Sequence, residues 1–244
     1  MKPKTLTDIK RHAEADYPRE ACGLIIIRRG REKYLPCKNL APDTEHFIIS
    51  AQDYAVAEEM GEIVAVVHSH PDAPASPSEA DKVSCEASGV LWHIIRVDGT
   101  EGIPTAGELI TIEPCGYQVP LVGRQFFHGV LDCYSLIRDW YQQTRSIELK
   151  QFSRADEWWN DGKSDLYTQG FPQAGFVSIE SNAEMQVGDV ILMQIRSTNG
   201  VPNHAAIYIG DGLILHHLHG HLSSRDVYGG YWQEVTRNVI RYVG

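Results

Sequence analysis

Two histidines at the end of an apolar stretch are the side chains best placed to do chemistry in the first half of the chain. Residues 63–67 are all aliphatic and lead directly into His68, Ser69, His70 and Pro71. In an extended strand alternate side chains point to the same face, so the two imidazoles converge on one point. We interpret the pair as ligands of a metal ion. The alternative is a pair of structural histidines at a strand edge.

A segment rich in Ser and Pro predicts a helix that carries the third ligand. Ser76 as the cap, Pro77 at the first helical position and Glu79 three residues after the cap are typical of a helix start. Ser78 and Asp81 are expected on one helical face, where the hydroxyl and the carboxylate approach the same metal. Two imidazoles and one carboxylate leave the fourth position of a zinc ion to water, which is the catalytic arrangement.

A catalytic zinc site also needs a proton acceptor that is not a ligand, and Glu20 stands just ahead of the apolar run at residues 24–27. Residues 18–24 (Pro-Arg-Glu-Ala-Cys-Gly-Leu), 68–71 and 78–81 together resemble the signature of the JAMM (MPN-plus) zinc metallopeptidases. The resemblance implies that His68, His70 and Asp81 are the zinc ligands. It implies Glu20 as the base that activates water and Ser78 as the residue that stabilises the charged tetrahedral intermediate. It also implies hydrolysis of peptide or isopeptide bonds next to ubiquitin-like, β-grasp proteins.

The second half contains a cysteine at a position that favours a nucleophile. Apolar residues 136, 137, 140 and 141 recur at helical spacing, which predicts Cys133 in the first turn of an amphipathic helix. The positive end of a helix dipole stabilises a thiolate, so a depressed pKa is expected for this thiol. A buried, inert cysteine is the alternative interpretation.

A candidate base follows in a predicted β-hairpin. Residues 204–209 form one expected strand, and residues 213–216 form the other. If the hairpin is centred on Asp211, His204 and His216 lie on the same face as diagonal neighbours, and one imidazole can orient the other. A two-residue turn at Asp211 and Gly212 would shift the register by one and bring His217 to that face instead.

Residues 132–137 (Asp-Cys-Tyr-Ser-Leu-Ile), the turn at 188–189 and residues 204–216 resemble the NlpC-type cysteine peptidases. The resemblance implies a papain-like fold that cleaves peptidoglycan stem peptides, typically between D-glutamate and the diamino acid. It assigns Cys133 as nucleophile, His204 as general base and His216 as the residue that holds its imidazole. This chain departs from the family pattern in two ways. Tyr134 stands where many relatives carry a small residue, and Cys133 and His204 are 71 positions apart (204 − 133), more than in compact members. The long spacing predicts an insertion at residues 153–175 that reshapes or covers the cleft.

Three further histidines, His217, His219 and His221, extend the cluster after His216. We interpret them as an incidental polar segment, with a second metal site as the alternative.

Composition narrows the class of protein. The chain has 244 residues, a formal net charge of −10 and no strong basic cluster, so nucleic acid is not an expected partner. It has no run of about 18 apolar residues, so we expect neither a membrane span nor a signal peptide. The five cysteines show no Cys-x-x-Cys spacing, which argues against a disulfide framework or a cysteine-rich zinc finger.

The order of the expected elements predicts an α/β (α+β) chain. Helices alternate with strands in the first half, whereas the second half places a helix before an antiparallel sheet. With the two resemblances, this predicts a JAMM-type α/β sandwich followed by a papain-like NlpC-type α+β domain. Scattered Gly and Pro residues predict a linker at about 113–121, which gives domains 1–112 and 113–244.

The two motifs in this order resemble the tail assembly protein K family of long-tailed bacteriophages. The resemblance implies a protein with two hydrolase sites, built in the host cytoplasm and then carried at the virion tail tip. Its implied partners are peptidoglycan stem peptides and other tail-tip proteins, one of them with a β-grasp, ubiquitin-like part. Two alternatives stay open: a structural tail-tip subunit whose sites are idle, and a bacterial isopeptidase of ubiquitin-like proteins.

Overall fold

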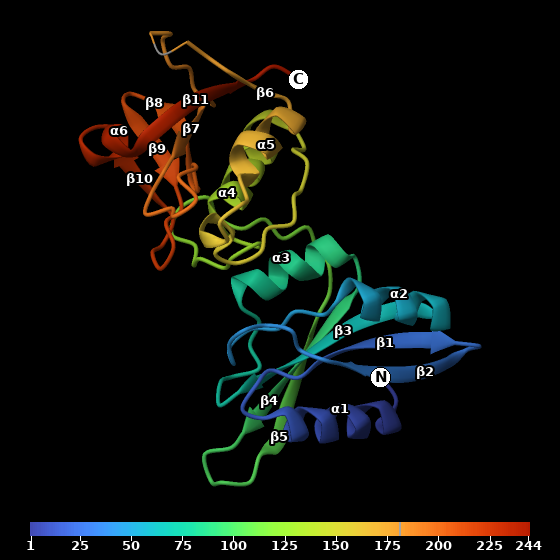
Figure 1. Cartoon of the computed structure of the whole chain (residues 1–244). Coiled ribbons are helices and arrows are strands. Elements are labelled where there is room, and N and C mark those ends of the chain that lie inside the picture. The colour runs from blue at the N-terminus through green and yellow to red at the C-terminus, as the bar shows by residue number, and fades with distance from the viewer. Residues whose placement is uncertain (181) are drawn as a thin grey trace. The chain divides into compact units, whose positions relative to one another are not determined.

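The computed structural model describes residues 1–180 and 182–244, which form two compact units, Met1–Gln118 and Val119–Gly244. Each unit has its own β-sheet (Figure 1). Each also has its own hydrophobic core. The α/β (α+β) fold class expected from the sequence is confirmed. The domain boundary near residue 113 stays a prediction. Within the described residues, no helix combines the length and apolarity that a membrane span requires.

The first unit, Met1–Gln118, is a five-stranded sheet with helices on both faces. The strand order is β2-β1-β3-β4-β5, in which β3 and β4 are parallel and all other neighbours are antiparallel. Its elements are α1 (Pro3–Asp16), β1 (Cys22–Arg28), β2 (Arg31–Cys37), α2 (Ala51–Met60), β3 (Glu62–Pro71), α3 (Glu79–Ser88), β4 (Leu91–Asp98) and β5 (Thr105–Ile112). Strand alternation sorts the core into two layers: Ile25 and Val67 pack with α1, while Leu24 and Val66 pack with α2 and α3.

Two local features of the first unit follow from its sequence. The hairpin of β1 and β2 turns between Arg28 and Arg31, which pair in register. Ser50 caps α2, because its side chain accepts the backbone N–H of Asp53 at 2.9 Å.

The predicted start of α3 is wrong by two residues. The N-cap is Ser78, not Ser76, and the helix begins at Glu79. The reason is a reciprocal capping box: the Ser78 hydroxyl accepts the Asp81 N–H at 3.1 Å, and the Asp81 carboxylate accepts the Ser78 N–H at 2.7 Å. Ser78 therefore lies at the helix terminus, and its hydroxyl is bound to Asp81.

The second unit, Val119–Gly244, is an antiparallel six-stranded sheet packed against helices. The strand order is β10-β9-β8-β7-β11-β6. Its elements are α4 (Cys133–Arg145), the 3-10 helix η1 (Trp158–Asn160), α5 (Leu166–Gln173), β6 (Phe176–Ser178), β7 (Val190–Met193), β8 (His204–Gly210), β9 (Leu213–His216), β10 (Ser224–Val227), α6 (Tyr231–Val235) and β11 (Thr236–Tyr242). The expected layout of a helix followed by an antiparallel sheet is confirmed.

The segment at 153–175, expected as an insertion, takes part in the main core of the second unit. Trp158, Tyr167 and Phe171 are buried there together with Leu136 and Ile137 of α4. Trp158 and Tyr167 also line the pocket described below. The segment therefore shapes the cleft from within the core and contributes its aromatic side chains to the wall.

Candidate catalytic sites

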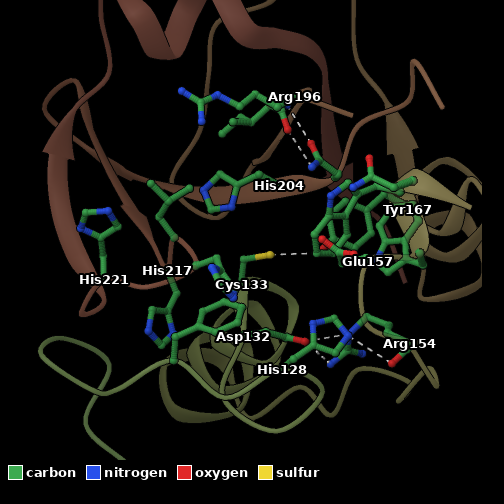
Figure 2. Close-up of a pocket in the computed structure, with 18 of the residues that line it drawn as sticks. His128, Asp132, Cys133, Arg154, Glu157, Tyr167, Arg196, His204, His217 and His221 are labelled. Carbon is green, nitrogen blue, oxygen red and sulfur yellow. Dashed lines mark hydrogen bonds and ion pairs between the residues drawn. The ribbon is translucent and has the colours of Figure 1, made fainter. Parts of the chain in front are cut away.

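Cys133 and His204 line one pocket of about 610 Å³ in the second unit (Figure 2). Cys133 is the first residue of α4, and His204 is the first residue of β8, against which that helix packs. Asp132 caps α4 by accepting the N–H of Ser135 at 2.8 Å. The cap fixes where the helix starts and thereby directs the thiol into the pocket that also contains the imidazole.

Three side chains form a hydrogen-bonded chain that ends at His204. Nε2 of His204 lies 3.1 Å from Nδ1 of His216, and Nε2 of His216 lies 3.0 Å from Oδ2 of Asp226. The hairpin pairs Ala206 with His216, which makes His204 and His216 diagonal neighbours, and β10 lies on the other side of β9. The sequence alone does not indicate that Asp226 contacts His216. An irregular loop separates it from the hairpin, so no characteristic spacing relates the two residues.

The hairpin register places His216, and not His217, beside His204. A bulge between Tyr208 and Gly210 absorbs the extra residue of the turn. The ring of His217 instead packs edge-on against Phe126, with the two ring centroids 5.1 Å apart.

The expected low pKa of the Cys133 thiol is wrong. Burial and then the charge of Asp132 raise this pKa to about 11, although Tyr167 and Arg154 act in the opposite direction. Burial, helped by His216 and His217, lowers the pKa of His204 to about 3. The helix dipole does not offset burial beside a carboxylate, and both shifts favour the neutral forms, a thiol at Cys133 and an uncharged imidazole at His204.

Two further residues act on the thiol and were missed in the sequence. The hydroxyl of Tyr167 lies 2.8 Å from Sγ of Cys133. Arg154 holds the capping carboxylate, since its Nε and Nη2 lie 2.9 and 2.8 Å from Oδ2 of Asp132. Both contacts join segments more than 20 residues apart in the chain, so no local sequence pattern predicts them.

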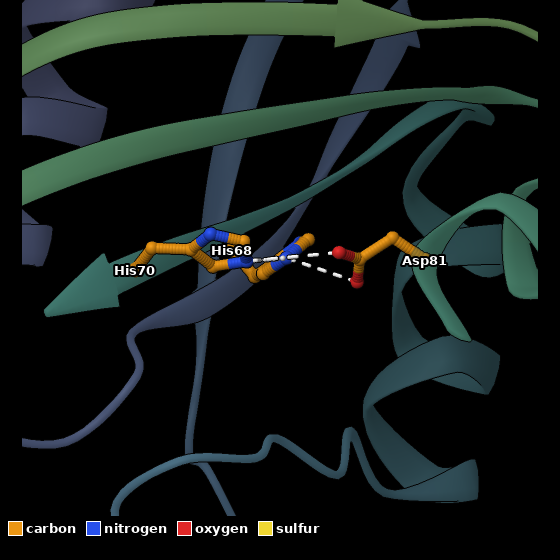
Figure 3. A group of neighbouring side chains, drawn as sticks. All are labelled: His68, His70 and Asp81. Atoms are coloured by element: carbon orange, nitrogen blue, oxygen red, sulfur yellow. Dashed lines mark hydrogen bonds and ion pairs between the residues drawn. The ribbon is translucent and has the colours of Figure 1, made fainter. Parts of the chain in front are cut away.

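In the first unit His68, His70 and Asp81 converge on one point (Figure 3). Their candidate ligand atoms all lie within 4.8 Å of one another. The Nε2 atoms of the two histidines are 3.1 Å apart, and they lie 3.2 and 3.6 Å from the carboxylate oxygens of Asp81. The strand places both imidazoles on one face, and the capping box of α3 directs the carboxylate toward them.

The donor set of this cluster fits a zinc ion. Nδ1 of His70 lies 2.7 Å from the carbonyl oxygen of Pro74 and donates to it, which leaves the Nε2 lone pair free to coordinate. The ring of His68 is stacked on Phe47 and meets the edge of Trp92, so its direction is fixed. Burial acts to raise the pKa of Asp81, but hydrogen bonds from His68, His70 and Ser78 lower it well below its usual value. The carboxyl is therefore ionised, as a metal ligand must be.

Glu20 lies at the entrance to β1, beside the end of β3. Cys22 pairs with His68, and Ala21 and Ser69 exchange hydrogen bonds, so continuing this register brings Glu20 next to His70. Glu20 is 7% exposed. Burial raises the pKa of Glu20 to about 9, and the charges of Asp81 and nearby acids add to the effect. A cation in the cluster would oppose this shift by attracting the ionised carboxylate.

Two family models match this chain, one in each unit. The model for prokaryotic homologs of the JAB domain matches residues 2–106, and the model for the NlpC/P60 family matches residues 123–241. A solved structure with some similarity is a protein from Desulfitobacterium hafniense, which is 26% identical, with a TM-score of 0.35, over 46% of this chain and 87% of that one.

Two relatives match most of the chain. The tail tip assembly protein K of Escherichia phage N15 is 42% identical over 99% of this chain and 96% of its own length. The tail tip assembly protein K of Escherichia phage lambda is 40% identical over 80% of this chain and 89% of its own length. The chain therefore belongs to the tail tip assembly protein K family, in which it combines a JAB-like domain with an NlpC/P60 domain.

Proposed function

We propose that this protein acts at the tail tip of a phage and has two hydrolytic sites. One is a cysteine endopeptidase for peptidoglycan stem peptides, and the other is a zinc-dependent peptidase or isopeptidase. The observation that supports the first most directly is that Cys133 and His204 line one pocket while His216 and Asp226 hold His204 from behind. Membership in the tail tip assembly protein K family supports the location.

The hydrogen-bond chain determines which nitrogen of His204 is free to act. A carboxylate only accepts hydrogen bonds, so His216 donates its Nε2–H to Asp226 and keeps a lone pair on Nδ1. His204 then donates its Nε2–H to that lone pair and keeps a lone pair on its own Nδ1. Nδ1 of His204 is thus the atom that takes the proton of the Cys133 thiol.

Peptide hydrolysis then proceeds in two stages. Sγ of Cys133 attacks the scissile carbonyl carbon while His204 takes the thiol proton, and the leaving amine receives that proton as the thioester forms. Water attacks the thioester with His204 as base, which releases the acid and restores the thiol. Because both groups rest in their neutral forms, we expect proton transfer to accompany the attack on the carbonyl.

The test of the cysteine site is digestion of isolated peptidoglycan by purified variants. We expect Cys133→Ala to release no muropeptides and to keep the zinc content of the wild type. Cys115→Ala, which changes an exposed cysteine of the first unit, is the matched control and should digest normally. Continued release of muropeptides by Cys133→Ala would show that the nucleophile is assigned wrongly.

In the first unit, His68, His70 and Asp81 would hold the zinc ion. When bound, zinc polarises a carbonyl oxygen and makes water acidic enough to act as a nucleophile near neutral pH. Glu20 would carry the proton from the attacking water to the leaving amine. Ser78 would stabilise the charged tetrahedral intermediate once its hydroxyl turns away from Asp81, to which it is bound here at 2.8 Å.

Metal analysis of the purified protein tests the zinc site separately. We expect one zinc ion per chain and its loss in His70→Ala. His93→Ala is the control, because His93 is a buried histidine of the same sheet that contacts Thr111 and lies outside the cluster. A wild-type protein that binds no zinc from a zinc-containing buffer would contradict the proposal.

The proposed partners are stem peptides and other tail-tip proteins, one of which has a β-grasp, ubiquitin-like part that the zinc site trims. We place the protein in the host cytoplasm during assembly and at the virion tail tip afterwards. Complementation of a phage that lacks this gene distinguishes these activities from a purely structural role. Virions that carry both Glu20→Gln and Cys133→Ala should fail to infect, and normal infection by them would favour the structural subunit.

A further inference from the structure

Asn39 is a buried residue whose side chain extends the hairpin of β1 and β2 beyond its last backbone pair. Cys22 pairs with Cys37 at the open end of the hairpin, so the same register sets Glu20 opposite Asn39. Nδ2 of Asn39 donates to the carbonyl oxygen of Glu20 at 2.8 Å, and the residue is 8% exposed. The side chain therefore holds the backbone of the proposed base at a point where the ladder has already ended.

The same amide also closes the loop of residues 40–48. Nδ2 donates to the carbonyl oxygen of His46 at 2.8 Å, while Oδ1 accepts the N–H groups of Ala41 at 2.8 Å and Ile48 at 3.1 Å. Together with the first bond, this uses both N–H groups and both lone pairs of the amide. A buried amide with all four bonds in place is fixed in one orientation, and removing it leaves four backbone groups without a partner.

Phe47 lies between the two loop residues that flank it and bind Asn39. Its ring stacks on that of His68, with centroids 4.7 Å apart and an angle of 23° between the planes. It also contacts Trp92, whose ring meets the edge of the same imidazole. Because Asn39 fixes the backbone on both sides of Phe47, it determines where this ring lies.

The two histidines of the metal cluster are held by different means. Nδ1 of His70 is bound to the carbonyl oxygen of Pro74 at 2.7 Å, which is how most metal-binding imidazoles are oriented. Nδ1 of His68 is buried and has no hydrogen-bond partner within residues 1–180 and 182–244. The direction of the His68 ring therefore depends on its aromatic neighbours, and one of them, Phe47, comes from the loop that the amide closes.

We propose that Asn39 is a positioning residue of the zinc site, which directs His68 toward the metal by holding Phe47 against its ring. This role rests on the proposed zinc peptidase and adds a residue outside the ligand set that determines its affinity for metal. Because the same amide binds the carbonyl of Glu20, one side chain fixes the backbone of the base and the ring that packs on a ligand.

Competition with a zinc chelator measures this role in purified variants. We expect Asn39→Ala and Phe47→Leu each to bind zinc roughly 10-fold more weakly than the wild type. The double variant should bind no more weakly than the weaker single variant, since both changes act through one ring. Thr111→Val, which removes a hydroxyl that contacts His93, and Ile49→Ala, which shortens an apolar side chain of the core that Phe47 packs on, are the controls. Additive losses in the double variant would overturn the proposal.

The visible spectrum of bound Co²⁺ separates positioning from a simple loss of stability, because at saturation it reports the geometry of the ligands. Asn39→Ala and Phe47→Leu should change the Co²⁺ bands in the same way, and the two controls should keep the wild-type spectrum. A wild type that binds metal while Asn39→Ala matches it in spectrum and affinity overturns this role and leaves the zinc site standing. A changed spectrum supports the role even if no peptide is hydrolysed.

Hydrogen exchange in the wild type serves if Asn39→Ala does not fold. Coupling between two sites is reciprocal, so zinc must stabilise the loop if the loop favours zinc. Exchange of the Ala41 and Ile48 N–H groups should slow several-fold when zinc binds. The N–H of Ala106, which is bound to the side chain of Glu14, is the control and should keep its rate. Equal rates at Ala41 and Ile48 with and without zinc contradict the inference.

Discussion

Nε2 of His216 lies 3.0 Å from Oδ2 of Asp226, and this contact links the buried His204 of the second unit to solvent through His216. The side chain of His216 is 3% exposed, whereas that of Asp226 is 40% exposed. The pairing of β9 with β10 brings them together, with Ser224 opposite His216. The outer side of the carboxylate thus remains in contact with solvent, while its inner oxygen fixes the tautomer of the two imidazoles.

Asp226→Asn should therefore impair catalysis more than binding. The amide N–H of Asn can donate to Nε2 of His216, which reverses the tautomer of His216 and then that of His204. Nδ1 of His204 would then carry a proton and could not accept the one from the thiol. We expect kcat to fall by roughly 10-fold or more, with a small change in KM. Asp211→Asn, at an exposed turn whose positive φ Asn tolerates, is the control.

Tyr167→Phe should make the thiol of Cys133 less acidic. The hydrogen bond from the Tyr167 hydroxyl lowers the pKa of this thiol, against the larger effect of burial. Removing the hydroxyl should slow alkylation of Cys133 by iodoacetamide several-fold at pH 9, measured at that cysteine by mass spectrometry. Tyr134→Phe loses a hydroxyl that is bound to the carbonyl of Lys150 and should react at the wild-type rate. Equal rates in all three proteins would contradict this role for Tyr167.

Ser78→Ala and Ser76→Ala form a matched pair, because only the first serine caps α3. Ser78→Ala removes the cap and a hydrogen bond to Asp81, so we expect about 1 kcal/mol less free energy of unfolding. The Asp81 carboxylate also becomes less fixed, and zinc affinity should fall roughly 10-fold. Ser76→Ala should change neither quantity. Thermal unfolding and competition with a zinc chelator measure the two effects.

The parts of the molecule that follow from local sequence were predictable. Strand alternation predicted that His68 and His70 share a face, and helical spacing predicted that Cys133 starts a helix. The cap of α3 was misplaced because Ser76 and Ser78 both fit a capping pattern, and only the approach of the Asp81 carboxylate distinguishes them. That approach depends on how the helix meets the sheet.

Contacts between distant segments were not predictable from one sequence. Asp226, Tyr167 and Arg154 reach the cysteine site from a separate strand, a helix and a loop, and each has an ordinary local sequence. The pKa of Cys133 was predicted with the wrong sign for the same reason. The helix dipole can be inferred from position, but burial beside Asp132 is a property of the folded unit.

Arg154→Leu tests whether the buried ion pair at the start of α4 stabilises the second unit. The side chains of Arg154 and Asp132 are 2% and 4% exposed, so the substitution leaves a buried carboxylate without its cation. We expect the free energy of unfolding to fall by about 3 kcal/mol at pH 7, measured with urea. Arg196→Leu, at an exposed position, should change it by less than about 0.5 kcal/mol.

The pH dependence of the difference in free energy of unfolding between the wild type and Arg154→Leu identifies the cause of that difference. Burial acts to raise the pKa of Asp132, but Arg154 and two backbone N–H groups lower it overall in the folded protein. The pair is therefore fully stabilising above the unfolded-state pKa of about 4, and its contribution is lost as pH falls through the lower folded pKa. The gap between the wild type and Arg154→Leu should be largest at pH 7 and narrow toward pH 3. A gap that stays constant across this range would show that packing around Arg154, and not its charge, is what the substitution removes.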